Sequence, residues 1–320
     1  MSNFKYKWEV QGKKGIVVKV VADSISFTKN RLITFELTYP RIIHSELMTH
    51  RQFSRNAMSS RAVPIKTLID QVVNGSAQPI EFGKNKTGMS SDGELDAFVE
   101  GYTANEWWNL AGLSASRFAN AFAEAGYHKQ VANRLLEPFQ FMKTVVTGTE
   151  FENFFKLRLA ADVDPTMKEL ASCMKEAYDS STPELLKAGE WHTPYVEHFR
   201  ESDGGATLEY IVDNISVTLE EAKAISASSC AQISYRNIDN SYDKAMKIYD
   251  RLGVGTEHFH ASPFEHQGTP MDMMVVDSKG FSGRNELSPL TWQQGITHVD
   301  SSYSLWSGNF KGFIQYRQLL

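Results

Sequence analysis

Alternating apolar and polar side chains mark the first part of the chain. Residues 4–10 and 15–22 have a pattern that predicts a β-hairpin, with QGKKG as its turn. Residues 33–38 alternate Ile, Phe and Leu with Thr and Glu, which predicts a further strand with one buried face. Residues 66–93 are rich in Gly, Ser, Lys and Asp, so we expect a long loop there.

Helical spacing of the apolar residues predicts a helix over about residues 94–124. Trp107 and Trp108 lie within this spacing, so we expect them to anchor a core or an interface rather than to stack nucleic-acid bases. Further helices are expected over residues 129–178. Their last segment places four apolar residues on one face: Met167, Leu170, Ala171 and Met174.

Two shorter helices are predicted later in the chain. Thr218 and Glu221 have the spacing of a capping box, which predicts a helix that begins there and runs to about Ser226. Residues 241–252 have helical periodicity as well.

These elements predict an α/β (α+β) fold, with a central mixed sheet flanked by a large helical region, in a single domain of residues 1–320. Within it, residues 1–65 carry strands, 66–93 the loop and 94–226 mainly helices, and residues 227–320 return to the sheet.

Composition narrows the classes of function. A formal net charge of −5 argues against a general nucleic-acid-binding surface, which needs a basic face. We find no apolar run long enough to span a membrane, and the charged N-terminus does not have the pattern of a signal peptide. We therefore expect a cytoplasmic protein without nucleic-acid or membrane partners. A Rossmann dehydrogenase or P-loop NTPase is not supported, because neither glycine-rich motif is present.

Cys173 and Cys230 are the only cysteines, which excludes a disulfide framework and any cysteine-rich metal site. No metal site is expected. Neither cysteine lies in the setting of an activated nucleophile, so both are interpreted as buried thiols.

The richest chemistry lies in residues 50–61, HRQFSRNAMSSR, just after the predicted strand 33–38. Arginine forks and serine hydroxyls are groups that bind phosphate. The alternative for such a run is a solvated basic turn.

Residues 49–59 resemble the signature of the flavin-dependent thymidylate synthases, written RHR, seven residues, then Ser. The corresponding residues here are Thr49, His50, Arg51 and Ser59, with Pro40 nine residues before Thr49 as in the family. Two residues depart from the pattern. Thr49 replaces the first arginine, and Ala57 stands where the family usually has a glutamate beside the nucleotide.

Two further blocks resemble the same family. ANRLLEP (132–138) and NFFKLR (153–158) resemble the segments that hold the nucleotide and touch flavin and pyrimidine, although the family's Ala-Gln-x-Glu is replaced by VDPT at 163–166. SYR (234–236) and HASPFEH (260–266) resemble its serine-tyrosine strand end and its flavin-binding loop.

This last block precedes the RHR-type strand in ordinary members and follows the helical region here. The chain therefore resembles a permuted, lengthened form of the kind found in phages, and EFGKNKTGM (81–89), GEWHTPYV (189–196) and NFKGFIQYR (309–317) fit that long form. The matching blocks cover roughly half of the chain, and three motifs together are more specific than any one.

The resemblance implies a role for each matching residue. The flavin would be contacted by His50, Arg51, Asn153, Ser234, His260, Ser262 and Glu265, and the nucleotide by Glu46, Ser59, Arg61, Arg134 and Arg158. His50 and Arg158 would be catalytic. His50 and Arg51 would stabilise the anionic reduced flavin, and Arg158 would clamp the pyrimidine and make C5 nucleophilic without covalent attack.

Structural alternatives exist for several of these residues. Arg134 could form a helix salt bridge to Glu137, and Arg158 could be a surface residue of its helix. Ser-Pro-x-Glu at residues 262–265 could be a proline turn that caps a helix.

The resemblance implies an enzyme that transfers a one-carbon unit from methylenetetrahydrofolate to C5 of dUMP to give dTMP, with FAD as cofactor and NADPH as reductant. It also implies a homotetramer with active sites between subunits. Glu46 stands where the family has a glutamine, and a carboxylate acceptor there suits the amino group of cytosine. A hydroxymethylated or otherwise modified product from dUMP or dCMP, and an inactive regulatory relative that binds nucleotide, therefore stay open.

Overall fold

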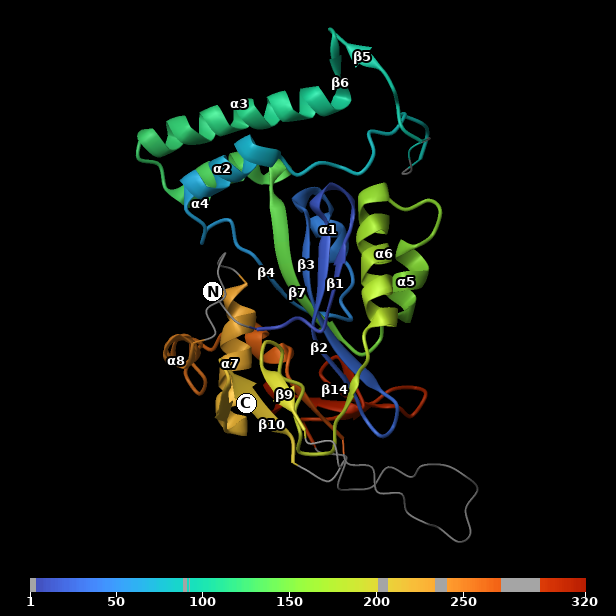
Figure 1. Cartoon of the computed structure of the whole chain (residues 1–320), viewed down its shortest axis with the longest axis vertical. Helices are drawn as coiled ribbons and strands as arrows, with labels where there is room; N and C mark the ends of the chain where they lie inside the picture. Colours follow the sequence, from blue (N-terminus) through green and yellow to red (C-terminus); the bar gives the residue numbers. More distant parts are fainter. Residues whose placement is uncertain (1–3, 89–90, 92, 201–206, 234–240, 272–293) are drawn as a thin grey trace.

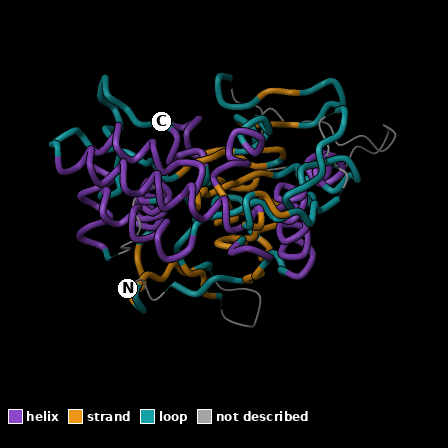
Figure 2. Tube along the Cα trace, turned by 90° about the horizontal axis from the view of Figure 1, so that it is seen from above, coloured by secondary structure: helices purple, strands orange, loops and turns teal. Residues whose placement is uncertain are grey.

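The computed structural model describes residues 4–88, 91, 93–200, 207–233, 241–271 and 294–320. These residues form a mixed α/β structure with several helices and mainly antiparallel sheets (Figure 1). Seen from above, the strands lie between two groups of helices (Figure 2). Ser234 and the rest of the SYR motif lie outside the described residues. Within the described part, no helix combines the length and the apolar character that crossing a bilayer requires.

The main sheet has six strands, with β1, β2, β3, β7 and β4 in that spatial order and antiparallel to one another. Their bounds are β1 Trp8–Gln11, β2 Val17–Ile25, β3 Arg31–Pro40, β7 Phe141–Gly148 and β4 Ser54–Ala57. The sixth strand, β8 (Glu184–Leu185), pairs parallel with the end of β2 and makes the sheet mixed. The predicted hairpin and third strand are therefore confirmed, as is the mixed sheet.

Strand β7 corrects the prediction of continuous helices over residues 129–178. It lies between β3 and β4, and its residues Thr144, Val145, Val146 and Thr147 are wholly buried. Such β-branched residues favour a strand that is covered on both faces. Only the flanks are helical: α4 (Lys129–Ala132), the 3₁₀ helix η3 (Asn133–Phe139), α5 (Glu152–Arg158) and α6 (Pro165–Ser180).

One face of the sheet carries the larger hydrophobic cluster. Ile33, Phe35 and Leu37 of β3 pack there, and α6 covers β1, β2 and β3. The predicted apolar face of α6 is confirmed, because Met167, Leu170, Ala171 and Met174 are all fully buried. Asp164 caps this helix by accepting from the backbone N–H groups of Thr166 and Met167.

The opposite face of β3 is buried too, although its alternation predicts one solvated face. Thr34 and Glu36 are only 0% and 2% exposed. Thr34 Oγ1 bonds Thr147 Oγ1 at 2.8 Å, and the Glu36 carboxylate accepts from Tyr195 Oη at 2.9 Å and pairs with Lys143 Nζ at 3.4 Å. Polar groups can be buried here because each has a hydrogen-bonding partner.

The predicted loop and the predicted helix 94–124 are each corrected in part. Residues Ile65–Gly75 form α2, whose apolar residues Leu68 and Val72 are buried. The long helix α3 is confirmed over Ala104–Glu124, but it begins ten residues later than predicted. Before it, β5 (Phe98–Val99) and β6 (Tyr102–Thr103) form a hairpin. The two turn residues, Glu100 and Gly101, both have positive φ, as a type I′ turn requires.

The C-terminal part forms smaller sheets and a second hydrophobic cluster, and none of its described strands joins the main sheet. The described residues of this part therefore return beside the main sheet without adding a strand to it: η4 (Ser262–Glu265) packs against β4, while β12 (Gly268–Pro270) pairs with β16 (Phe313–Gln315) and, by a bridge, with His192. The remaining strands are β9 (Glu197–Phe199), β10 (Glu209–Val212), β11 (Ile215–Val217), β13 (His298–Val299), β14 (Leu305–Ser307) and β15 (Phe310–Lys311).

Two predicted helices of this part are confirmed. α7 (Leu219–Gln232) starts at the Thr218–Glu221 capping box and is longer than expected, and α8 is Tyr242–Arg251. The span 94–226, predicted to be mainly helical, contains α3 to α6 and the start of α7, and also the strands β5 to β11.

Both cysteines are buried thiols, as interpreted from the sequence. Cys173 lies in α6 and Cys230 in α7. Burial raises the pKa of Cys173 to about 11, and burial also raises the pKa of Cys230. Neither thiol is activated as a nucleophile.

Candidate functional site

Arg158, at the end of α5, joins two segments that lie far apart in the sequence. Its Nε donates to His50 Nε2 at 2.7 Å and its Nη2 to Thr49 Oγ1 at 3.3 Å, while Nη1 forms an ion pair with the Glu46 carboxylate. Glu46 belongs to the short helix α1 (His44–Leu47), and Thr49 and His50 follow it. All three nitrogens of the guanidinium are therefore engaged, which orients its plane.

His50 is neutral in this arrangement. Its Nε2 accepts from Arg158, so the ring proton lies on Nδ1. Burial, followed by the positive charges of Arg158 and Arg55, lowers the pKa of His50 to about 4. The imidazole packs edge-on against Phe154, with ring centroids 4.8 Å apart. At neutral pH His50 is thus a hydrogen-bonding group and not a cation.

Arg55 was not identified from the sequence, although it lies in the same arginine-rich segment. It lies on β4, and its Nη1 donates to the carbonyl oxygens of Met48 at 2.6 Å and His50 at 3.1 Å. These bonds fix the turn that carries Thr49 and His50. Arg55 is a positioning residue for His50.

His50 and Asn153 line one cavity of about 520 Å³, a volume within the range of small-molecule sites. The other lining residues are Gln52, Phe53, Glu150, Glu152, Phe154, Lys156, Asp300, Trp306 and Lys311. Three segments distant in sequence therefore form this cavity: the turn around His50, the start of α5 and a C-terminal segment.

The C-terminal wall of this cavity is built by hydrogen bonds. Asp300 Oδ2 accepts from Trp306 Nε1 at 2.8 Å, which fixes the indole. Lys311 donates its backbone N–H to Thr149 Oγ1 at 2.9 Å, and its ammonium group pairs with Glu150 at 3.6 Å. None of these wall residues was singled out from the sequence, where only the NFKGFIQYR landmark pointed to this region.

The HASPFEH loop returns to the His50–Arg61 segment, as predicted. Its 3₁₀ helix η4 (Ser262–Glu265) packs against β4. Gln315 Nε2 bridges the two by donating to Ser54 Oγ at 3.2 Å and to the Glu265 carbonyl at 3.1 Å. The Glu265 carboxylate pairs with Arg317. His260 and Ser262 are exposed.

A buried chain of polar side chains connects this loop to the main sheet. Ser24 Oγ bonds His192 Nδ1, His192 Nε2 bonds Thr34 Oγ1, and Thr34 bonds Thr147, each at 2.8 Å. Thr147 Oγ1 then bonds His266 Nδ1 at 2.7 Å. Among the described residues, His266 Nε2 is buried without a hydrogen-bonding partner, and burial lowers the pKa of this ring to about 3. No periodic pattern in the sequence marks this series of hydrogen bonds.

The nucleotide candidates form a second group beyond the other end of β4. Asn133 Nδ2 donates to the carbonyl oxygens of Ser60 at 2.6 Å and Val63 at 2.9 Å, so the segments that carry Arg61 and Arg134 are held together. Both arginines are exposed.

Arg134 donates Nε to the Gln130 carbonyl at 3.2 Å, whereas Glu137 pairs with Arg41 at 3.0 Å. The alternative of an Arg134–Glu137 salt bridge is therefore wrong. Ser59 is half-buried and Arg51 is exposed. Within the described residues, no hydrogen bond or ion pair joins Arg61 or Arg134 to His50 or Arg158.

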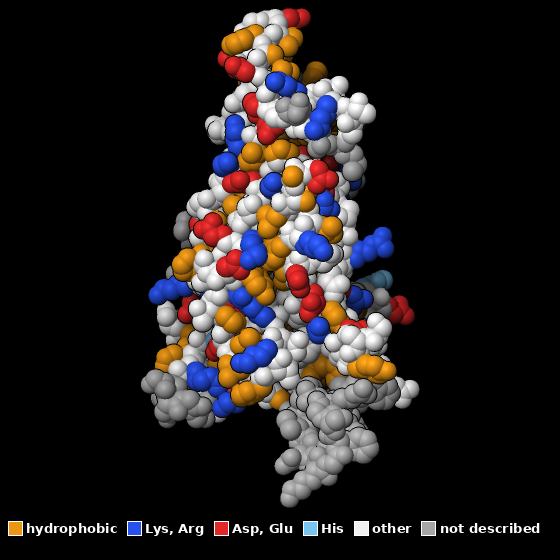
Figure 3. Space-filling model, turned by 90° about the vertical axis from the view of Figure 1, so that its right-hand side faces the viewer, with side chains coloured by type: hydrophobic (Ala, Val, Ile, Leu, Met, Phe, Trp, Pro, Cys, Tyr) orange, Lys and Arg blue, Asp and Glu red, His pale blue; other side chains and the backbone are white. Residues whose placement is uncertain are grey.

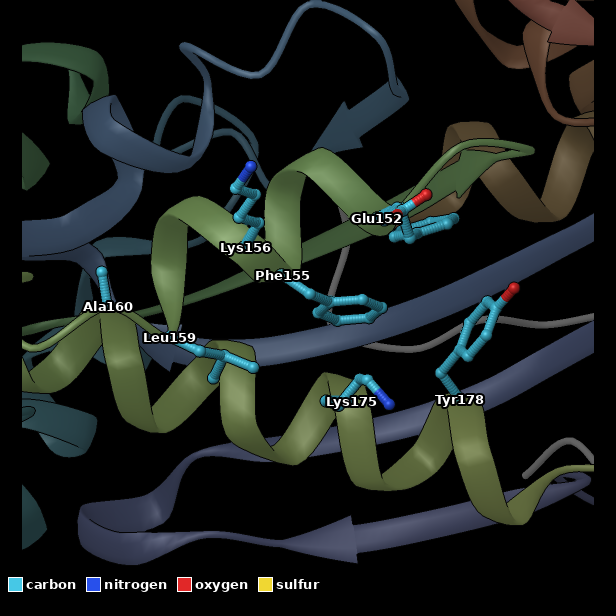
Figure 4. A pocket seen from close by; sticks show the side chains of 8 residues that line it. Glu152, Phe155, Lys156, Leu159, Ala160, Lys175 and Tyr178 are labelled. Atoms are coloured by element: carbon cyan, nitrogen blue, oxygen red, sulfur yellow. The ribbon is translucent and has the colours of Figure 1, made fainter.

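α5 also borders a second cavity, of about 610 Å³, between α5 and α6. Phe155 and Tyr178 lie on its walls with ring centroids 5.7 Å apart, and Lys175 lies beside them (Figure 4). Glu152 and Lys156 line both cavities, so α5 separates them. The face that carries α5 and α6 shows hydrophobic side chains interspersed with charged ones (Figure 3).

Among the described residues, no group of three or more His, Cys, Asp or Glu side chains is arranged to hold a metal ion. The donor set of the cavity that contains His50 suits an organic ring instead. Phe53, Phe154 and Trp306 contribute apolar side chains to its lining, and the amides of Gln52 and Asn153 contribute hydrogen-bonding groups. These residues fit a flavin ring.

No family model matches the chain, and no curated protein matches it. Among solved structures, it is similar to the UMP/dUMP methylase PolB from Streptomyces cacaoi, bound with 5-Br UMP, at 16% sequence identity. The match covers 54% of this chain and 92% of that chain, with a TM-score of 0.41. A likeness this low carries no argument about this chain.

Proposed function

We propose that this chain is a flavin-dependent enzyme that modifies C5 of a pyrimidine deoxynucleotide monophosphate. In its specific form, the proposal is the conversion of dUMP to dTMP, with methylenetetrahydrofolate as carbon donor, FAD as cofactor and NADPH as reductant.

The observation that carries the proposal is the meeting of Arg158 with His50 and Glu46. These residues come from two motifs that resemble the same enzyme family and are more than 100 residues apart, yet the guanidinium contacts both partners directly. The Thr49 hydroxyl, at 3.3 Å, is its most distant acceptor. A pyrimidine carbonyl that replaces Thr49 would therefore meet an oriented cation beside a neutral imidazole.

When bound, FAD would supply the hydride that this reaction needs. The chain itself would hold the ring between the aromatic wall of Phe53 and Phe154 and the indole of Trp306, with Asn153 as a hydrogen-bonding partner. The amino acids thus orient the cofactor, and Arg158 stabilises the charge that develops on the base.

The stoichiometry of NADPH consumption tests this proposal. A methylene unit becomes a methyl group only if a hydride is added, so one NADPH must be consumed for each dTMP, with tetrahydrofolate and NADP⁺ as the other products. Purified protein should be yellow, should bleach with NADPH in the absence of air, and should convert dUMP with this stoichiometry. Colourless protein that cannot be reconstituted with FAD would refute the proposal.

Thr49 favours a second candidate product, a hydroxymethylated pyrimidine nucleotide. The family has an arginine at this position, whereas Thr49 here is an acceptor for Arg158, so the site has one positive charge fewer. A hydroxymethyl product needs water in place of a hydride, so no NADPH would be consumed per product. Incubation with dUMP and with dCMP, product masses and NADPH oxidation together separate the candidates.

The remaining alternative is an inactive relative that binds nucleotide and regulates other enzymes. It predicts thermal stabilisation by dUMP or dCMP without any product. We also propose, as the resemblance implies, a cytoplasmic homotetramer with sites between subunits. Arg61 and Arg134 lie apart from Arg158. This separation supports active sites between subunits, because a second copy could supply the phosphate contacts that the Arg158 group lacks.

A further inference from the structure

The long helix α3 has an outer face that is poor in charge. Between Trp107 and Ala123 the only charged residue is Arg117. α3 is the outermost layer at one end of the molecule (Figure 1), and its inner side packs on α2 and η3. A helix with one face in water normally has charged residues along that face. The composition of α3 therefore suits a helix that is covered on both sides.

Large apolar side chains project from this outer face. Trp107 and Leu110 are each 37% exposed, Leu113 is 39% exposed and Phe118 is 63% exposed. Most residues that pack inward are small, such as the buried Gly112; the exception is Trp108, whose Nε1 donates to the Ala77 carbonyl at 2.8 Å. The large apolar residues of α3 thus lie mainly on the side that faces away from the core, the reverse of an ordinary surface helix.

The β5–β6 hairpin extends the same apolar surface. Trp107 Nε1 donates to the Val99 carbonyl at 2.8 Å, and its ring contacts Tyr102 with centroids 5.2 Å apart. In the hairpin, Phe98 is 70% exposed, Val99 59% and Tyr102 44%. At ~200 Å² for each large side chain, helix and hairpin together expose on the order of 700 Å² of apolar surface, close to the ~800 Å² that each partner buries in a standard stable interface.

The order of residue sizes along α3 fits a second copy of itself. A two-fold axis through Ser114 would pair two antiparallel α3 helices, with Trp107 opposite Ala121 and Leu110 opposite Phe118. A bulky residue then meets a small one at the ends, and a small serine on the axis allows close approach. We propose that the outer face of α3, with the β5–β6 hairpin, binds the same face of a second copy of this chain. This contact is remote from the Arg158 site and does not depend on the proposed function.

Matched charge substitutions test the surface. Phe118→Glu should place a carboxylate in the contact and weaken self-association at least tenfold, measured by sedimentation of the full-length protein over a range of micromolar concentrations. Phe27→Glu is the control, because Phe27 is equally exposed, at 65%, in the turn between β2 and β3; its assembly should match the wild type. A wild-type chain that is monomeric throughout, or equal effects of the two substitutions, would overturn the proposal.

A cysteine cross-link tests the register even if Phe118→Glu fails to fold. Both native cysteines are buried, so an introduced surface thiol reacts without competition. Ser114→Cys should form a covalent dimer on mild oxidation because the two thiols meet on the axis, whereas Ser172→Cys, exposed on α6, should not. Absence of the Ser114→Cys dimer, or equal dimer from both variants, would overturn the proposed pairing.

Discussion

At the scale of single residues, the role of Arg158 depends on the planar shape of its guanidinium as much as on its charge. The guanidinium contacts the imidazole of His50, the hydroxyl of Thr49 and the carboxylate of Glu46 through three different nitrogens. A lysine keeps the charge and loses this fork. We expect Arg158→Lys to lower turnover on the order of 100-fold at saturating nucleotide while the flavin content stays normal.

That prediction is checked by stopped-flow and steady-state assays beside an absorbance measurement of bound flavin. Near-wild-type turnover of Arg158→Lys would return Arg158 to a structural role. Loss of flavin together with activity would show that the residue holds the cofactor site together instead of acting on the base.

Arg61 should behave differently from Arg158. It is exposed and lies in the nucleotide group, where a phosphate contact stabilises ground state and transition state nearly alike. Arg61→Ala should therefore raise KM for the nucleotide about tenfold or more and leave kcat nearly unchanged. A fall in kcat without a change in KM would contradict a role in phosphate binding.

At the scale of elements, Gln315 of β16 connects its own C-terminal segment to β4 and to the HASPFEH loop, both of which lie far from it in the sequence. Its amide donates to Ser54 Oγ, to the Glu265 carbonyl and to Asn309 Oδ1, and the side chain is 2% exposed. Gln315→Met keeps the size but removes the donors. We expect a loss of about 1–3 kcal/mol in the free energy of unfolding, because buried acceptors are left unsatisfied.

The same substitution should weaken FAD binding, since Gln315 holds the HASPFEH loop against β4. Urea denaturation and flavin titration measure the two effects, with Gln294→Met as an exposed control that should change neither. Normal flavin affinity in a clearly destabilised Gln315→Met protein would mean that the loop does not contact the cofactor.

The elements that the sequence predicted well each carry a strong local signal. The apolar stripe of α6 and the capping box of α7 are local signals, and both are confirmed. β7 was missed because it is buried on both faces and has no alternation, so only its β-branched residues mark it. α2 was missed for a different reason. Its apolar residues have helical spacing, but its C-terminal half lies beside a polar, glycine-rich stretch.

At the scale of the whole molecule, the sequence motifs contain three residues that meet, but they do not separate these from Arg61 and Arg134 and do not show the wall of the cavity. His50, Glu46 and Arg158 come together as their motifs predict. Trp306 and Lys311 depend on tertiary packing of the C-terminal segment, for which no local pattern exists. The burial of Thr34 and Glu36 likewise follows from a chain of side-chain hydrogen bonds between distant segments, which alternation alone cannot reveal.

The pH dependence of stability is also a property of the whole molecule. Burial is the largest cause of a lowered pKa at four histidines: His44 and His50, each at about 4, His266 at about 3, and His192 well below its usual value. In the unfolded chain these rings titrate near pH 6.5. Their contribution to stability is thus fully present above pH 6.5 and is lost as pH falls towards 4, because only the unfolded state binds the protons.

We expect the free energy of unfolding to fall between pH 6.5 and pH 4 by up to about 1.4 kcal/mol per pH unit for each such histidine. His266→Gln should reduce that slope by about one proton, since His266 is wholly buried. His298→Gln changes an exposed ring and should leave the slope as it is. Urea unfolding at successive pH values measures all three proteins. A wild-type stability that stays constant from pH 7 to pH 5 would mean that these rings gain protons in the folded state, and the neutral His50 on which Arg158 relies would then be wrong as well.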